Sequence, residues 1–273
     1  MSTKLPWTKS SIKDGFQEIK LRSWNNFHEF LNSELLQART YIWRGQRNAN
    51  WQLLSTLDRV LWAKAPKTLI ERRVGSRLNS PLRERHLEEF KLAVRGRRGV
   101  NPQRELSENE WWALGQHFGL ATPLLDWTTS PFTAAFFAFA PIGDPQSSRR
   151  AIWALATQAT LERSKYVLAK HGSAKPASVV ELVRPMSDEN PRLVSQGGLF
   201  TRAPDGIPLD DWVKTSFAGP FNLRALIKFT IPNADRADFL RSLNRMNINH
   251  LSLFPDLVGA SEHSNLSLTI KNY

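Results

Sequence analysis

The chain has 273 residues, 41% hydrophobic and 10% aromatic, so it is long and apolar enough to bury a core, and global disorder is excluded. It contains no Cys, which excludes a disulfide scaffold, a catalytic thiol, a zinc finger and an iron–sulfur site. Lys and Arg number 37 against 25 Asp and Glu, and the net charge of +12 favours polyanionic partners. Because no stretch approaches about 18 apolar residues and no apolar signal core begins the chain, we expect a cytoplasmic protein without membrane contact.

The first half of the chain contains several patterned segments. Apolar residues at helical spacing predict a helix over 24–36, and the aromatic run 41–43 predicts a strand. Residues 57–104 are predicted to be mainly helical. The sequence Ser-Glu-Asn-Glu at 107–110 is a capping box, so we expect a helix to begin there and to end at Gly119.

Thr129-Ser130-Pro131 is a second helix start, because a hydroxyl residue precedes a proline at the first helical position. The residues that follow, 132–140, are apolar nearly all round, which indicates a buried helix. Pro141 and Gly143 are expected to end it.

The second half of the chain alternates irregularly between strand and helix patterns. Strands are predicted over 151–156, 179–183 and 223–231, followed by a helix that Asn233 caps and that ends at Arg245. Without repeated βαβ units, this order favours an α+β fold with a mixed, mostly antiparallel sheet and flanking helices. The sequence contains no clear linker, so we expect one domain over 22–273 after a polar lead-in over 1–21.

Positive charge is concentrated between Arg44 and Arg104, where twelve Arg and three Lys stand against five acidic residues. One interpretation is a solvated helical face, with an exposed basic loop at 95–99. The other is a surface for phosphates, and it predicts sequence-tolerant binding of nucleic acid that weakens steeply as salt rises.

Four segments carry polar residues that a core does not need. The first is Trp43-Arg44-Gly45-Gln46, at the end of the predicted aromatic strand. A guanidinium binds phosphate or carboxylate through two parallel hydrogen bonds, and glycine leaves the backbone open beside it. The alternative is an Arg that extends from an edge strand into solvent.

The second segment, 115–130, holds His117 near a helix C-terminus, Asp126 in an apolar run, and three hydroxyls at a helix N-terminus: Thr128, Thr129 and Ser130. The free N–H groups of that helix start form an anion site. The alternative is local, with the hydroxyls capping the helix and Asp126 accepting loop N–H bonds.

The third and fourth segments are 191–201 and 249–259. Two glycines follow Gln196, which either lets backbone approach a ligand or forms an ordinary turn. Asp256 follows a proline and either serves a site or caps a helix. Because burial of an unpartnered polar group costs about 1–3 kcal/mol, we predict that five polar residues converge in one pocket: Arg44, Gln46, Asp126, Thr128 and Gln196.

In this order, the sequences WRGQ, GQHFGLATPLLDWTTSPFTAAFFAF, RLVSQGGLFT and LFPDLVG resemble the FRG domain, a bacterial family named for its aromatic-Arg-Gly motif. The resemblance covers roughly residues 22–262. The commoner family pattern has Pro-Thr-Arg-Leu-Leu-Asp-Trp, whereas Ala121 and Pro123 replace the Pro and the Arg here. Any role of that Arg is absent or falls to another residue, Arg192 or Arg202.

A strand-borne Arg, a hydroxyl-rich turn and a late carboxylate are also similar to the layout of ADP-ribosyltransferases. In that superfamily an Arg or His binds NAD, a Ser-Thr-Ser motif supports the nicotinamide ribose, and a Glu orients the acceptor. The likeness implies an ADP-ribosyltransferase-like core in which Arg44, Thr128 and Asp256 are catalytic, with Glu181 and Glu262 as alternatives to Asp256. It implies that NAD, without a metal, contacts Arg44, Gln46, His117, Asp126, Thr128, Thr129, Ser130 and Gln196.

These resemblances imply a bacterial toxin or defence effector that modifies RNA or DNA and that an acidic antitoxin holds inactive. The alternative is a non-catalytic nucleic-acid-binding or adaptor module of bacterial defence, which needs no buried carboxylate facing Arg44. A metal-independent nuclease with His117 or His250 as general base is a third hypothesis, although no paired acid is evident. The sequence names neither the acceptor nor the oligomeric state.

Overall fold

The computed structural model describes residues 5–35, 40–64, 80–99, 105–141, 147–171, 178–185, 191–220 and 222–273. Its strands are β1 Trp7–Lys9, β2 Phe16–Leu21, β3 Tyr41–Gln46, β4 Leu124–Thr128, β5 Arg149–Ala156, β6 Glu181–Val183, β7 Gly198–Arg202 and β8 Leu226–Pro232. Its α-helices are α1 Asn25–Phe30, α2 Thr56–Lys64, α5 Ser80–Ala93, α6 Glu108–His117, α7 Pro131–Phe139, α8 Thr157–His171, α9 Pro191–Ser195, α10 Leu209–Ser216, α11 Arg236–Arg245, α12 His250–Leu253 and α13 Leu257–Thr269. A π-helical turn, η1 Leu31–Leu35, extends α1, and a 3-10 turn, η3 Asn233–Asp235, precedes α11.

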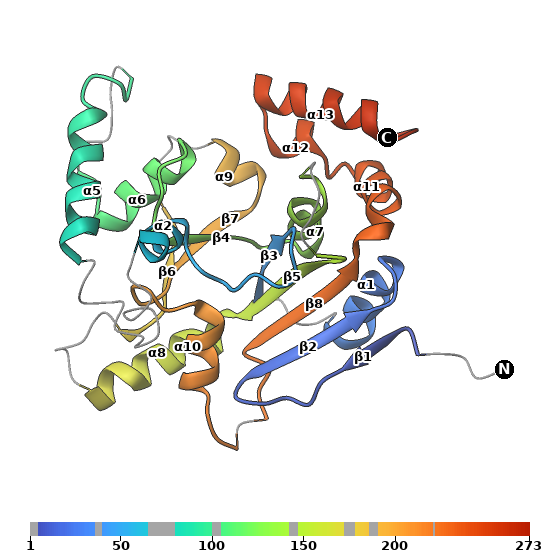
Figure 1. The fold of residues 1–273 in the computed structure, drawn as a ribbon, viewed down its shortest axis with the longest axis horizontal. Helices are drawn as coiled ribbons and strands as arrows, with labels where there is room; N and C mark the ends of the chain where they lie inside the picture. Colours follow the sequence, from blue (N-terminus) through green and yellow to red (C-terminus); the bar gives the residue numbers. More distant parts are fainter. Residues whose placement is uncertain are drawn as a thin grey trace.

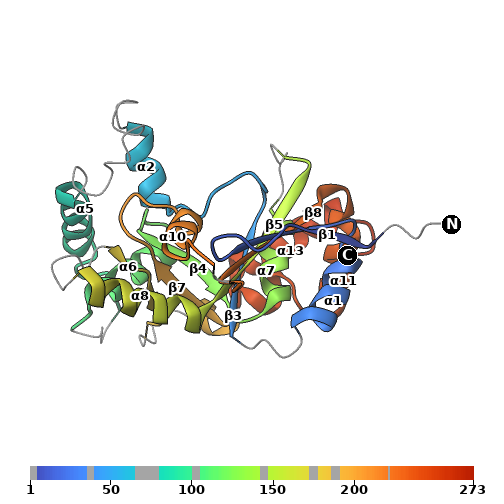
Figure 2. The same ribbon diagram turned by 90° about the horizontal axis from the view of Figure 1, so that it is seen from below.

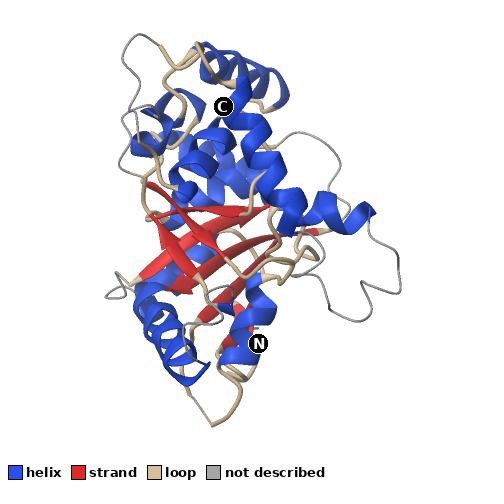
Figure 3. Cartoon of the chain, turned by 90° about the vertical axis from the view of Figure 1, so that its left-hand side faces the viewer, coloured by secondary structure: helices blue, strands red, loops and turns tan. Residues whose placement is uncertain are grey.

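One sheet joins the strands in the order β1-β2-β8-β5-β3-β4-β7-β6 (Figure 1). Its described pairs are antiparallel except for the parallel pair β2 and β8. Helices lie on both sides of the strands (Figure 3). The predicted α+β fold with a mixed, mostly antiparallel sheet is confirmed. No helix of the described ranges is long and apolar enough to cross a membrane.

Local signals in the sequence place the two helices that flank β4. Ser107 accepts a hydrogen bond from the Glu110 amide and Glu110 accepts one from the Ser107 amide, which is the predicted capping box of α6. Ser130 accepts one from the Thr133 amide, 3.2 Å away, and Pro131 occupies the first turn of α7. Both helix starts are confirmed, because each satisfies a backbone N–H that has no partner within its helix.

The structure differs from the sequence-based expectation at two places. Asn233 does not cap the helix that ends at Arg245, because its side chain accepts a hydrogen bond from Arg150 Nε, 2.5 Å away, and Asp235 stands at the cap position. The strand predicted over 41–43 continues through Gln46, so Arg44 and Gly45 lie within it. Gly143 and the parts 65–79 and 100–104 of the basic region lie outside the described residues.

Three apolar clusters form the core. The first packs α1, α7 and α11 on one face of the sheet through residues that include Phe27, Phe136 and Phe239. The second packs α10 and the loop before α2 on the other face, around Trp153 and Trp212. The third packs α2, α5 and α6 at the end of the sheet that holds β4, β7 and β6. Figure 2 shows α2, α5 and α6 at one end of the molecule and α1 and α11 at the other.

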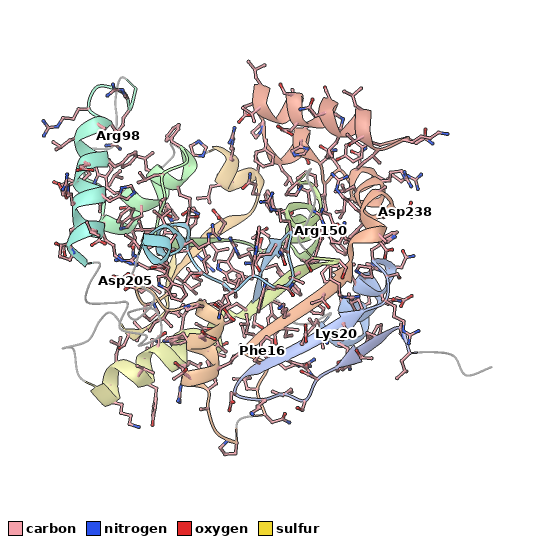
Figure 4. All side chains as sticks on the ribbon, viewed as in Figure 1. Phe16, Lys20, Arg98, Arg150, Asp205 and Asp238 are labelled. Carbon is pink, nitrogen blue, oxygen red and sulfur yellow. The ribbon has the colours of Figure 1, made fainter. Side chains whose placement is uncertain are left out.

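Helix α7 is fixed at its C-terminus by two arginines. Arg150 Nη1 donates to the Ala138 carbonyl O over 2.6 Å, and Arg236 Nε donates to the Phe139 carbonyl O over 2.9 Å (Figure 4). Burial, and then the charges of Arg236 and Arg47, lower the pKa of Arg150 to about 10. The carbonyls at a helix C-terminus carry partial negative charge, so they stabilise these two cations. This helix therefore has a fixed position beside β3.

Candidate functional site

A groove of about 850 Å³ opens beside β3. We call it the arginine groove, and its lining comes from β3, the loop that follows it, α2 and the end of α7: Arg44, Gly45, Gln46, Arg47, Asn50, Trp51, Gln52, Leu54, Arg59, Trp62, Phe137 and Pro141. Among the described residues, the lining contains three guanidinium groups and two tryptophans but no carboxylate. Such a groove favours an anionic ligand with a planar group.

The three arginines line the same groove, and Arg44 and Arg59 lie close enough to repel each other. Arg47 stacks over the ring of Trp51, with its guanidinium carbon 5.2 Å from the ring centroid. Arg59 Nη2 donates to the Thr56 hydroxyl over 3.1 Å. Burial, and then the neighbouring charge of Arg44, lower the pKa of Arg59 from its ordinary value. Because like charges here repel one another, an anion bound between Arg44 and Arg59 relieves that repulsion.

Arg44 lies where β3 and β4 diverge. The register between these strands consists of one pair, Trp43 with Thr128. Beyond that pair, Arg44 Nη1 donates to the Asp126 carbonyl O over 2.8 Å and lies 3.3 Å from Asp126 Oδ2. Its Nε is buried without a partner among the described residues. The Arg44 side chain is 17% exposed and that of Asp126 is 65% exposed, so the carboxylate is open to solvent.

Asp126 faces a smaller pocket of about 160 Å³, here called the second pocket. Its lining comes from α6, β4, α9, β7 and the residue after α12: Gln116, His117, Asp126, Trp127, Arg192, Leu193, Gln196, Gly198, Leu199, Phe200 and Phe254. Gln116 Nε2 donates to Asp126 Oδ1 over 2.5 Å, and the Thr122 hydroxyl donates to Gln116 Oε1. These bonds orient the carboxylate, with Arg44 on its other oxygen.

At the far side of the second pocket, Arg192 binds Asp256. Arg192 Nε donates to Asp256 Oδ2 over 2.6 Å, and its guanidinium lies over the ring of Phe254. Asp256 Oδ1 accepts from the Gly259 amide over 3.0 Å and caps α13. The Gly259 amide, and then the Arg192 guanidinium, lower the pKa of the Asp256 carboxyl. Both oxygens have partners, which supports the helix-cap interpretation of Asp256.

His117 lines the second pocket without a hydrogen bond from its ring to any described residue. Burial, and then the charge of Arg192, lower the pKa of this imidazole from its ordinary value of 6.5, while Asp256 acts in the opposite direction. The ring is therefore neutral near pH 7 and offers a lone pair to the pocket.

The hydroxyl-rich turn at 128–130 makes hydrogen bonds to neighbouring backbone. The buried Thr128 hydroxyl donates to the Gln196 carbonyl O over 2.7 Å and accepts from the Ser130 amide over 3.1 Å. Gly197 has φ +56, and a Cβ there would lie 2.8 Å from the Thr129 hydroxyl. Gly197 thus lets the turn after α9 approach the turn after β4. The hydrogen bonds of Thr128 and Ser130 fit the local interpretation, in which these hydroxyls stabilise the turn and cap α7. Thr129 keeps an exposed side chain.

Of the five residues expected in one pocket, four divide between two pockets and one lines neither. Arg44 and Gln46 line the arginine groove, Asp126 and Gln196 line the second pocket, and Thr128 is buried without lining either. Two contacts join the pockets: the pair of Arg44 with Asp126, and the rings of Phe137 and Phe254, whose centroids are 6.0 Å apart.

Gln46 also has a structural role. Its Nε2 donates to the Gln52 carbonyl O over 3.2 Å, and its Oε1 accepts from Trp153 Nε1 over 2.8 Å. The buried amide thereby fixes the loop that carries Arg47 and Trp51.

The alternative residues for the third catalytic position lie away from Arg44. Glu181 accepts a hydrogen bond from Asn109, 3.0 Å away, and Glu262 lies on α13. Arg202, one alternative for the replaced family Arg, pairs with Glu108 at 2.8 Å and lines neither pocket. Arg192, the other alternative, lines the second pocket.

Sequence reasoning missed four lining residues of the arginine groove: Arg47, Trp51, Arg59 and Trp62. The signal was present, because the stretch RGQRNANWQL places two arginines and a tryptophan around small polar residues. The sequence did not indicate that this stretch lies next to α2, which supplies Arg59 and Trp62 to the groove.

In a comparison with protein families, residues 39–147 match the FRG domain. The chain contains an FRG domain. The matched part of the FRG domain includes the lining of the arginine groove together with Gln116, His117 and Asp126, whereas Arg192, Gln196 and Asp256 lie beyond it. No curated protein and no solved structure matches the chain.

Proposed function

We propose that this FRG-domain chain binds NAD in the arginine groove and transfers its ADP-ribose to a nucleic acid. The observation that carries the proposal is the lining of the groove, with three guanidiniums and two tryptophans but no carboxylate. Arginine forks fit the two phosphates of a dinucleotide, and tryptophan faces stack on its bases.

The chemistry needs a carboxylate beside the ribose. Breaking the bond between ribose and nicotinamide develops positive charge on the sugar, as in glycoside hydrolysis, and a nearby carboxylate stabilises that charge. Asp126 is the described carboxylate that contacts Arg44, and it is open to solvent. Asp256 is engaged by Arg192 and by the cap of α13. The proposal therefore assigns the catalytic carboxylate to Asp126.

The net charge of +12 supports a nucleic acid as the acceptor. The same charge supports an acidic inhibitor protein that covers the groove, as expected for a cytoplasmic toxin with its antitoxin. Purification in high salt separates such a partner before activity is measured, because screening weakens charge-driven contacts.

The test is release of nicotinamide from NAD and labelling of RNA or DNA by labelled NAD. We expect Arg44→Ala and Asp126→Asn each to lower the rate on the order of 10²–10³-fold, as is common when one electrostatic stabiliser is removed, with circular dichroism unchanged. Arg241→Gln, on α11, is the matched control and should retain the wild-type rate. A larger loss of rate in Asp256→Asn than in Asp126→Asn would show that Asp256 is the catalytic carboxylate.

A second candidate function is non-catalytic binding of single-stranded nucleic acid. The stack of Arg47 on the half-exposed Trp51 favours it, because cations over aromatic rings form binding platforms for successive bases. If the protein freed from any inhibitor neither releases nicotinamide nor labels RNA, DNA or protein, this binding function replaces the transferase.

A further inference from the structure

The second pocket lies beside the arginine groove, because Asp126 of its lining pairs with Arg44 of the groove. Arg44 of the groove binds Asp126 through Nη1, and Phe137 of the groove contacts Phe254 of the second pocket. A molecule in each pocket thus lies next to the Asp126 side chain, which is 65% exposed. Two substrates that react with each other need this adjacency, since the reacting atoms must meet within about 3–3.5 Å.

The size of the second pocket limits what it accepts. Its volume is about 160 Å³, roughly that of five water molecules in the liquid. One planar heterocycle fits such a space, whereas a dinucleotide does not. Next to the pocket, the Phe118 ring is 71% exposed and lies 4.7 Å from the His117 ring. Exposed aromatic side chains stack on the unpaired bases of single strands.

Among the described residues that line the second pocket, His117 is the polar side chain without a hydrogen-bond partner. Gln116 is held by Asp126 and Thr122, Arg192 by Asp256, and Gln196 donates to the Leu253 carbonyl O over 3.1 Å. The His117 ring makes no hydrogen bond within the described part of the chain. A neutral imidazole so placed accepts a proton.

We propose that the second pocket receives an unpaired base of the acceptor nucleic acid and that His117 takes the proton this base loses. The proposal rests on the transferase function above. The bond between ribose C1′ and the nicotinamide nitrogen breaks, and its electron pair leaves with neutral nicotinamide. A base nitrogen forms the new bond to C1′, and its proton passes to His117. Asp126 stabilises the charge on the ribose between the two steps.

The first test compares His117→Gln with the wild-type chain, using NAD and mixed-sequence single-stranded RNA and DNA 20-mers as probes. General-base catalysis contributes about 10²–10⁴-fold, so we expect transfer to fall at least 100-fold. The ratio of labels transferred to nicotinamide released should also fall at least tenfold. A general loss of folding would lower both quantities together and leave this ratio unchanged. His263→Gln on α13 is the control and should retain the wild-type ratio.

Three results separate the two proposals. A wild-type chain that releases no nicotinamide overturns both. A wild-type chain that releases nicotinamide and labels the 20-mers, with an unchanged ratio in His117→Gln, overturns the base-pocket proposal and leaves the transferase standing. A fall in the ratio for His117→Gln but not for the control supports both.

The second test uses the pH profile of transfer. Transfer should rise with pH through the pKa of His117 and then level off, because the neutral ring is the active form. Arg192→Gln removes the positive charge that lowers this pKa, so the rising limb should move to higher pH. His117→Gln should abolish the limb. A limb that persists unshifted in both variants overturns the role of His117.

Discussion

Arg44 and Gly45 follow each other in β3 and meet different requirements. Arg44 needs a guanidinium that reaches Asp126 and the groove, as its contacts show. Gly45 needs no side chain at all, because α7 crosses the strand against it. A Cβ at position 45 would clash with the Ala134 carbonyl O and lie 2.5 Å from the Ala138 backbone N. The Arg-Gly pair therefore places a guanidinium in the groove next to a close contact between strand and helix.

We expect Gly45→Ala to destabilise the fold by about 1–3 kcal/mol or more, the usual cost of overpacking, because the clash is with backbone that cannot turn away. Urea unfolding followed by tryptophan fluorescence measures this. In Gly115→Ala the added Cβ meets the movable side chain of Leu120, and alanine gains about 1 kcal/mol in a helix interior. Equal losses in the two variants would contradict the backbone explanation.

At the scale of elements, α5 is held to the rest of the molecule by a buried cation. Arg83 of α5 pairs with Asp58 of α2, and both side chains are only 6% exposed. Arg83 also lies 3.4 Å from Asp205, which is labelled in Figure 4. Asp58 also accepts from the Gly206 amide, 2.9 Å away, and from the Ser55 hydroxyl, 2.6 Å away. This network ties α5 to α2, which supplies Arg59 and Trp62 to the groove.

Arg83→Ala should cost about 3–5 kcal/mol of unfolding free energy, because it leaves two carboxylates in a buried place without their cation. Burial already raises the pKa of Asp205 despite Arg83. Chemical denaturation measures the loss, and hydrogen exchange locates it in α5 and α2. Arg85→Ala, on the same helix, removes an exposed pair with Glu89 and should change stability by no more than about 0.5 kcal/mol. A similar cost for both would show that the buried network does not anchor α5.

At the scale of the whole molecule, the positive charge is partly internal. Arg83, Arg150 and Arg236 have protein partners within the fold. Arg44, Arg47 and Arg59 also have contacts within the fold, but they line the groove. A count of basic residues in the sequence therefore overstates the charge available to a phosphate backbone, and we propose that the arginines of the groove supply it.

Affinity for a single-stranded 20-mer should fall steeply between about 50 and 200 mM salt if phosphates are bound. Arg47→Gln should lower the slope of log affinity against log salt by about 0.7, the value for one phosphate contact to a single strand. Arg241→Gln should leave the slope unchanged. Fluorescence anisotropy measures both. Binding that is indifferent to salt would indicate instead that the groove faces a protein.

The sequence alone determined the elements whose signals are local. The capping box at Ser107 and the Ser130-Pro131 start placed α6 and α7, because a cap bonds to a backbone N–H within three residues. The aromatic run at Tyr41 placed β3, and the irregular order of elements gave the α+β class with a mostly antiparallel sheet. The motif order also indicated the FRG domain, which the family match over 39–147 confirms.

Only the tertiary structure decided which polar residues meet. Asp126 and Arg44 are 82 positions apart and pair where β3 and β4 diverge, while Asp256, chosen from the sequence, pairs with Arg192. The sequence is compatible with Arg44 pairing with either aspartate, because a carboxylate accepts hydrogen bonds from any cation that the fold brings within reach. The division of the site into an arginine groove and a second pocket follows from the packing of α2, α7 and α9, which no local pattern encodes.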